Sequence, residues 1–403
     1  MPASLATVSG ILKEIYEPPL RKQLNEETTT IKRLKRTSKG VSETTGGKYV
    51  TFPVHYQRNS GVGARRENES LPTPGNQGTA AAQVGLKYLY GSIKVSGQLF
   101  EIVDKDYQAF ISAVDLEIEG LKRDVLKDLN RQVFGNGTGA LATTSSSGAV
   151  STLVITSGVQ NLQIGEFVDY FLPATLTADG AAKGSTTITN ITDNGDGTGS
   201  VTVSPATVAG LASGDVLVRN GNANREWTGL GAIVTNTGAL YNIDPANVGV
   251  WKATVDDPGS TRPLAENQII KNVDAVRTFG GETSLLVASL GVRRAYWNLL
   301  VQQRQFVNTK EFTGGFTGLG FTTDQREVPF IADIDAPKST LYGLDESTLK
   351  IYQTGDWSFM DRDGSMWDRV QGFDSYMATL YQYSQMGCDR RNANFVQKNI
   401  TEA

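Results

Sequence analysis

The sequence is poor in the residue types that most enzymes use for chemistry. Its 403 residues include one histidine, His55, and one cysteine, Cys388. A single cysteine excludes a disulfide framework within the chain and a cysteine-rich zinc site. A single histidine, with no serine in a Gly-x-Ser-x-Gly turn, gives no indication of a catalytic triad. These absences predict a structural protein rather than an enzyme, with no catalytic residues.

Long hydrophobic runs are absent as well. No stretch of about 18 apolar residues occurs, so no membrane span is predicted. Met1–Gly10 lacks the charged start and apolar run of a secretion signal, and we therefore expect synthesis in the cytoplasm. Two glycine-rich stretches, Gly135–Gly139 and Gly314–Gly318, do not continue into Gly-Lys-Ser/Thr, which disfavours nucleotide binding. No cofactor is predicted.

An acidic stretch at Asp193–Gly199 superficially resembles a calcium-binding loop. An EF-hand loop would end on a glutamate at the position that Ser204 occupies here. Asn-Gly and Asp-Gly pairs between alternating strands are stronger indications of hairpin turns. We therefore predict a turn here and no metal site.

Positive charge is concentrated at the start of the chain, although the whole chain has a net charge of -4. Residues 1–40 hold eight lysine and arginine side chains against four glutamates. The run Ile31–Arg36 suits weak contact with nucleic-acid phosphates or with the acidic face of another subunit; a solvated amphipathic helix is the simpler alternative. Because residues 20–39 hold few apolar side chains, we expect them to lie along another subunit. The candidate basic residues are Lys32, Arg33, Lys35 and Arg36.

A long polar stretch follows the first predicted strand. Strands are predicted at Lys48–Val54 and Leu86–Val95, and the residues between them, Arg58–Gly85, are rich in Gly, Asn, Pro and charge. Two strands flanking so long a loop predict an extended hairpin, and loops of this length usually carry function. The charged residues expected to contact another subunit are Arg58, Arg65, Arg66, Glu67 and Glu69.

Asp104–Phe134 shows the strongest helical periodicity in the chain. Apolar residues recur at steps of three and four from Phe110 to Leu129, and Gly135-Asn136-Gly137 ends the pattern. Such a helix is about 45 Å long at 1.5 Å per residue. Its length suits a helix that crosses a domain from end to end.

The composition then changes. Between Thr138 and Thr237 only about a tenth of the residues are charged, and short alternating runs are separated by turn-rich spacers. Gly165-Glu166 and Gly214-Asp215 each place a glycine and an acid before a predicted strand. We predict an inserted all-β module, either a small barrel or a sandwich.

The rest of the chain mixes both periodicities. Helices are predicted at Glu266–Thr278 and Val292–Val301, around a buried strand at Ser284–Ser289. Three short strands and a tyrosine-rich strand or helix follow, at Val328–Ile331, Ser339–Leu344, Thr348–Tyr352 and Ser375–Met386.

The carboxy-terminal residues carry a family resemblance. Val328–Asp345 and Ser347–Tyr352 resemble the end of tailed-bacteriophage major capsid proteins. In that family a Pro-hydrophobic-hydrophobic-x-Asp strand precedes a Leu-Tyr-x-Leu-Asp strand and a Leu-Lys-Ile-Tyr strand. Arg369–Asp374 fits the same pattern, and Phe134–Gly139 is similar to the turn that ends the family's spine helix.

The resemblance implies an α+β protein with the Hong Kong 97-type capsid fold. Its parts would be an N-terminal arm, an extended loop hairpin, a long spine helix, and peripheral and axial domains, with the all-β module as an insertion. The implied segments are the arm at 1–46, the extended loop at 47–97, the peripheral domain with the spine helix at 98–137, the inserted module at 138–237, and the axial domain with the rest of the peripheral domain at 238–403.

The same resemblance implies a function in a virion capsid. Copies of the chain would assemble into hexamers and pentamers of an icosahedral shell that encloses double-stranded DNA. A scaffolding protein, a portal and a decoration protein are the other implied partners. Some relatives join a lysine to an asparagine across subunits, and Lys87 or Lys94 with Asn392 or Asn394 are available for this.

Two alternative functions use other features of the sequence. An encapsulin-like compartment shell would share the fold and enclose an enzyme, but a shorter chain without a large β insertion is expected there. A secreted glycan-binding protein is indicated only by the Thr- and Gly-rich module, and the missing secretion signal opposes it.

Overall fold

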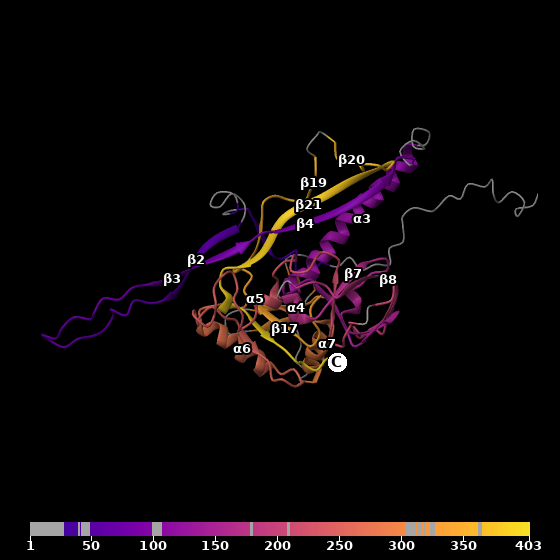
Figure 1. The fold of residues 1–403 in the computed structure, drawn as a ribbon. Helices are drawn as coiled ribbons and strands as arrows, with labels where there is room; N and C mark the ends of the chain where they lie inside the picture. The colour runs from indigo at the N-terminus through magenta and orange to yellow at the C-terminus, as the bar shows by residue number, and fades with distance from the viewer. Residues whose placement is uncertain are drawn as a thin grey trace, which may run out of the picture.

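The computed structural model describes eleven parts of the chain, listed at the end of this paragraph. They form a mixed α+β protein, as the sequence predicts (Figure 1). A long helix and a long two-stranded ribbon run diagonally across the molecule, above a mixed sheet and beside a small barrel, and one hairpin projects far to the side. The described residues are 28–38, 41, 49–98, 107–177, 180–207, 210–302, 311–312, 316–317, 319–322, 327–361 and 365–403.

The long helix is α3 (Tyr107–Phe134), which confirms the predicted helix; its expected first residues, 104–106, lie outside the described part. It packs along strand β4 (Lys87–Ser96). The close approach explains Gly91 of β4, because a Cβ atom there would lie 2.9 Å from a methyl carbon of Leu121 on the helix. Glycine at this position therefore sets the distance between helix and sheet.

The partner of β4 differs from the prediction. Its antiparallel neighbour is β21 (Ser375–Cys388), paired from Ser375↔Ser96 to Ser384↔Lys87, and not the strand at the start of the hairpin. The hairpin instead joins β2 (Tyr49–Gln57) to β3 (Gly78–Gly85). The sequence predicts a polar loop at Gly78–Gly85, and the structure has strand β3 there. Alternate small side chains are buried along it, which is the period of a strand.

The prediction that residues 20–39 lie along another subunit is wrong for their described part. Residues 28–38 pack on their own chain, where Ile31 and Leu34 are buried in the main core. Strand β1 (Lys35–Thr37) pairs in parallel with β18 (Leu349–Gln353). The prediction was wrong because two buried apolar side chains and a short strand are enough to hold this segment on the folded surface of its own chain. Local composition does not show that such a surface is present.

Residues 140–219 form a closed six-stranded barrel in the order β10-β5-β6-β9-β8-β7. Its interior is filled by aliphatic side chains such as Leu153, Ile188 and Val201. The two Gly-acid pairs stand before neighbouring strands, β7 and β10, which pair with each other, and both glycines have positive φ. The strands are β5 (Ala140–Thr144), β6 (Thr152–Ser157), β7 (Phe167–Phe171), β8 (Gly184–Asp193), β9 (Gly199–Ser204) and β10 (Val216–Arg219).

A second sheet has the order β11-β22-β17-β12-β16-β15. Helices α6 (Glu266–Thr278) and α7 (Leu290–Gln302) cover one face of it, and the other face belongs to the core that contains the end of α3. The strands are β11 (Thr254–Asp256), β12 (Leu285–Ala288), β15 (Leu319–Thr322), β16 (Glu327–Ala332), β17 (Leu341–Leu344) and β22 (Phe395–Gln397).

Short elements complete the fold. They are the helices α4 (Pro173–Thr177) and α5 (Leu230–Ile233), the 3₁₀ turns η1 (Val159–Asn161) and η2 (Arg391–Ala393), and the strands β13 (Glu311–Phe312), β14 (Phe316–Thr317), β19 (Ser358–Phe359) and β20 (Asp368–Arg369).

A buried arginine holds the connection between α5 and the second sheet. Arg391 is 1% exposed, and its guanidinium donates to the carbonyl oxygens of Ile233 (2.9 Å), Gly238 (3.1 Å) and Trp251 (3.4 Å). It also donates to Ala232, Thr235 and Thr237. No carboxylate is among these acceptors. Burial lowers the pKa of Arg391, and the surrounding carbonyl dipoles take the place of water around its charge.

We predict that Arg391→Lys destabilises the unassembled subunit by about 3 kcal/mol or more. An ammonium group has three donors, and each buried carbonyl left without one costs about 1–3 kcal/mol. Urea unfolding followed by tryptophan fluorescence measures the change. Arg390→Lys is the matched control, because the exposed Arg390 side chain donates to the carbonyl of Phe279, outside the buried cluster of carbonyls around Arg391. Equal stability of the two variants would contradict the role of Arg391.

Candidate interface surfaces

The tip of the β2–β3 hairpin, residues 58–77, extends away from the rest of the molecule (Figure 1). All five residues predicted to contact another subunit lie in it and are exposed: Arg58, Arg65, Arg66, Glu67 and Glu69. Two apolar side chains of the tip are also exposed, Val62 at 87% and Leu71 at 84%. The tip therefore offers both charge and apolar surface to solvent.

Local hydrogen bonds give the tip a defined shape. The side-chain oxygen of Asn59 accepts from the amides of Gly61 (2.7 Å) and Gly75 (3.1 Å), which ties the two sides together. Further out, Arg65 donates to the carbonyl of Ser70 (2.9 Å), and the Arg66 amide donates to the side chain of Glu69 (2.9 Å). A protruding hairpin gains little stability by itself, so a shaped and unsupported tip is typical of a contact surface.

The predicted basic run is divided in the structure. Lys32, Lys35 and Arg36 are exposed, whereas Arg33 forms a bidentate pair with Glu346 at 2.8 and 3.2 Å. No hydrogen bond or ion pair among the described residues joins this run to the hairpin tip. Three exposed cations thus remain beside β18 as a separate surface.

Sequence reasoning missed a patch of tyrosines on the β4–β21 ribbon, on the side away from α3. Tyr88 and Tyr90 of β4 are 57% and 55% exposed and stand opposite Tyr383 and Tyr381 of β21. The rings of Tyr88 and Tyr383 meet edge to face at 5.0 Å, and a hydrogen bond with Tyr383 raises the pKa of Tyr90. We call these four residues the tyrosine face. The available signal was a pair of tyrosines two residues apart in each strand, Tyr88 with Tyr90 and Tyr381 with Tyr383, since residues two apart in a strand share a face.

The ribbon continues the tyrosine face with further exposed side chains. Met377 lies opposite Lys94 in the register of the two strands, and the Lys94 ammonium lies 4.8 Å from the ring centroid of Phe373. Tyrosine, methionine and a cation over an aromatic ring are a composition typical of protein interfaces.

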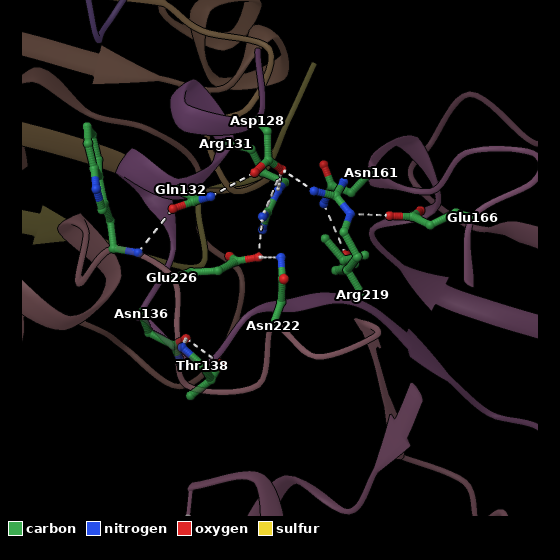
Figure 2. Close-up of polar contacts among 12 residues, drawn as sticks. Asp128, Arg131, Gln132, Asn136, Thr138, Asn161, Glu166, Arg219, Asn222 and Glu226 are labelled. Atoms are coloured by element: carbon green, nitrogen blue, oxygen red, sulfur yellow. Dashed lines mark hydrogen bonds and ion pairs between the residues drawn. The ribbon is translucent and has the colours of Figure 1, made fainter. Parts of the chain in front are cut away.

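A network of ion pairs fixes the barrel to α3 (Figure 2). Asp128 of α3 accepts from Arg131 (3.0 Å) and faces Arg219 of β10 (3.4 Å). The two arginines each hold a further acid: Arg131 binds Glu226 at 2.7 Å, and Arg219 binds Glu166 at 2.7 Å. Five alternating charges thus link the helix to the loop before β7, to the last barrel strand β10 and to the segment that follows the barrel.

The ionised state of this network follows from its geometry. Burial opposes the charge of Asp128, but Arg131 and Arg219 outweigh it and lower the pKa of its carboxyl group. Burial likewise opposes the charge of Arg131, and Asp128 and Glu226 outweigh it and raise the pKa of its guanidinium. Both residues are therefore charged at neutral pH.

The described residues contain neither a metal site nor a membrane-spanning helix. Within them no three histidine, cysteine or acidic side chains gather as around a metal ion, and no helix is long and apolar enough to cross a membrane. His55 is exposed and contacts Gln77 across the hairpin.

Of the asparagines considered for crosslinking, Asn394 is fully buried. It accepts from the Asp345 amide (3.0 Å) and donates to Arg390 (3.2 Å), so it has a structural role within its own chain.

We predict that Asp128→Asn lowers the unfolding free energy by about 1.5–3 kcal/mol at pH 7, the usual size for hydrogen bonds to charged groups. Because folding lowers the pKa of Asp128 below its ordinary value of 3.8, its contribution is complete above that pH and disappears as the pH falls through the folded pKa. Urea titrations between pH 3 and 7 measure both effects.

Glu119→Gln is the control on the same helix, since it removes only an exposed ion pair with Arg123. It should change stability by about 0.5 kcal/mol or less. If Asp128→Asn behaved like Glu119→Gln at every pH, the network would not hold the barrel.

Comparisons by sequence find no relative: no family model matches the chain, and no curated protein does. Comparison with solved structures finds capsids. A chain of the cyanophage A-1(L) capsid asymmetric unit is 13% identical, with a TM-score of 0.62 over 99% of this chain and 100% of the other. A Mycobacterium phage Bobi chain is 12% identical, with a TM-score of 0.48 over the full length of both chains.

The SrpI encapsulin complex of Synechococcus elongatus PCC 7942 also matches, at 8% identity and a TM-score of 0.46, over 99% of this chain and 96% of the other. The likeness to the cyanophage chain spans almost every residue of both proteins. The chain therefore has the fold of a phage capsid protein, and the resemblance carried by its carboxy-terminal residues is confirmed at the level of the fold.

Proposed function

We propose that this chain is a structural, non-enzymatic subunit of an icosahedral phage capsid that encloses double-stranded DNA. The observation that carries the proposal is the hairpin tip, a shaped surface that its own chain leaves unsupported. The fold shared with a cyanophage capsid chain supports it. Copies of the chain assemble into hexamers and pentamers in the virion, after synthesis in the host cytoplasm.

The contact between copies joins the hairpin tip of one to the tyrosine face of the next. Val62 and Leu71 supply apolar groups for the tyrosine rings, and Glu67 or Glu69 reaches Lys94 beside them. Tip and face are different surfaces of one chain, so the contact is head-to-tail, and head-to-tail contacts close into rings when the rotation allows it. Hexamers and pentamers are two such closures.

The other surfaces have proposed partners of their own. Lys32, Lys35 and Arg36 face the packaged DNA and contact phosphates without base recognition, so that these contacts weaken with salt. The barrel faces outward as a platform for a decoration protein, and a scaffolding protein and a portal complete the set of partners. We keep the segments proposed from the sequence: arm 1–46, extended loop 47–97, peripheral domain 98–137, insertion 138–237, and axial domain with the remaining peripheral part 238–403.

Replacing the hairpin tip, residues 58–77, by a two-residue Asn-Gly turn tests the function directly. Gln57 and Gly78 are paired in the hairpin, so this turn closes the strands without disturbing them. We expect a folded subunit with an unchanged thermal midpoint that forms no shells by electron microscopy, with the scaffolding protein present. Regular shells from this variant would overturn the proposed contact.

The tyrosine face has its own test. Tyr88→Ser combined with Tyr90→Ser should also abolish shells, because both rings are exposed and their loss leaves the fold intact. Val154→Ser on the barrel, at a side chain that is 52% exposed, is the control that should leave shells unchanged. Nuclease-protected DNA inside native particles is expected, whereas an enzyme cargo without DNA would favour a compartment shell.

A further inference from the structure

The hairpin tip contains a short segment with two prolines, Leu71-Pro72-Thr73-Pro74. The ring of a proline fixes its φ at about -65°, and the residue before a proline is kept away from the helical region. Both effects favour an extended polyproline II backbone, and the structure has neither a helix nor a paired strand at these residues. We call residues 71–74 the proline segment.

The opposite side of the tip lies close against the proline segment. A Cβ atom on Gly61 would be 3.1 Å from Cα of Pro74, and one on Gly63 would be 3.7 Å from Cγ of Pro72. Leu71 and Pro74 are exposed, whereas Pro72 is half-buried. Because a polyproline II helix has three residues per turn, Leu71 and Pro74 share one edge of the segment. That edge is the one that faces solvent.

Hydrogen bonds hold both ends of the proline segment. Before it, Nε of Arg65 donates to the carbonyl of Ser70 at 2.9 Å. After it, the amide of Gly75 donates to the side-chain oxygen of Asn59 at 3.1 Å. The segment is thus presented in a fixed conformation, which reduces the entropy lost when it binds to another surface.

The tyrosine face is ridged rather than flat. Tyr383 is half-buried, and its ring centroid lies 5.0 Å from that of Tyr88 and 6.3 Å from that of Tyr90. The planes of these two exposed rings are turned by 87° and 76° from the plane of Tyr383. Steeply inclined aromatic rings are the kind of surface that binds proline-rich segments, since rigid apolar groups fit against them.

The spacings of the two surfaces match. Residues three apart in a polyproline II helix are about 9 Å apart, and residues two apart in a strand are about 7 Å apart. Leu71 and Pro74 can therefore contact Tyr90 and Tyr88 at the same time. Binding as an added β-strand is disfavoured, because Pro72 and Pro74 have no backbone N–H to donate.

Charge favours one direction of the segment on the ribbon. Two acids, Glu67 and Glu69, come before the proline segment, and no charged residue follows it as far as Gln77. Lys94 is exposed on the same face of β4 as Tyr90, four residues further along. Attraction between the acids and Lys94 places the start of the segment at that end, so the segment runs antiparallel to β4.

We propose that the proline segment of one copy binds the tyrosine face of the next, with Leu71 beside Tyr90 and Pro74 beside Tyr88. The inference rests on the proposed head-to-tail contact between copies. It identifies the part of the tip that is recognised, the mode of recognition and the direction of the bound segment.

Assembly of the full-length protein tests the mode of recognition. Pro72→Ala combined with Pro74→Ala keeps the charges of the tip and releases the backbone restriction. With the scaffolding protein present, the protein concentration that gives half-maximal shell formation by light scattering should rise about tenfold. Thr73→Ala is the matched control, because Thr73 lies off the edge shared by Leu71 and Pro74, and it should leave this concentration unchanged.

Two results separate this inference from the proposed function. Native-like assembly of the double alanine variant overturns the inference, and the proposed function stands if removal of residues 58–77 still abolishes shells. Normal shells without residues 58–77 contradict the head-to-tail contact and this inference together.

Disulfide trapping in the assembled protein tests the direction. Ser70→Cys is paired with Ser92→Cys, which is exposed on the same face of β4 as the tyrosines. Asn76→Cys with Ser92→Cys is the pair for the opposite direction, and native Cys388 is buried. Ser70 and Asn76 are up to about 20 Å apart, so the first pair should give about tenfold more linked subunits on a non-reducing gel. Equal yields, an excess of the second pair or no link in either pair would overturn the proposal.

Discussion

The last two turns of α3 are the constraint on which the other parts depend. Their apolar side, Leu129, Val133 and Phe134, is buried in the main core. Their polar side reaches outward: Asn130 contacts the arm and the Asp333–Asp335 turn, and Arg131 contacts Glu226 after the barrel. About ten residues at the end of one helix thus contact the arm, the Asp333–Asp335 turn, the segment after the barrel and the main core.

The chemistry of that helix end explains how a β insertion is tolerated there. A barrel with its own closed core is stabilised by contacts in its own interior. The rest of the chain therefore has to fix only the two segments that connect it. Gln132 accepts from the Trp227 amide at 3.1 Å, and Arg131 and Asp128 bind Glu226 and Arg219. Buried charges of this kind fix orientation more than they add stability, because each must first lose its water.

The sequence was informative where the structure is local. The periodicity from Phe110 to Leu129 predicted α3, and Glu266–Thr278 agrees with α6 at both ends. Alternation also predicted an all-β module between Thr138 and Thr237, where the structure has the barrel with strands such as Thr152–Ser157. These patterns show which face of a helix or strand is buried. The helical and strand periods differ enough to be recognised from one sequence.

Pairing across the chain could not be predicted in this way. β4 was expected to close the hairpin and instead pairs with β21, nearly 300 residues later. The tyrosine face forms only through that pairing, since neither Tyr88 nor Tyr383 indicates the other. No local pattern marks Arg391 as buried, because its burial depends on carbonyl groups of a distant loop. Which strands pair over long distances depends on the shapes of their surfaces and on competition among all strands for the same partner. The sequence of a single segment does not contain this information.

The contact between Thr30 and Asp333 joins residues 303 positions apart, and β1 adds itself to β18 at a similar separation. Residues 28–37 are synthesised before Asp333 and β18, so their docking surface exists only after the roughly 300 residues between them have emerged from the ribosome. Closure of such a distant contact is slow and comes late in folding. Residues 28–37 are thus secured late in folding, which leaves them accessible to other proteins while the residues up to β18 are synthesised.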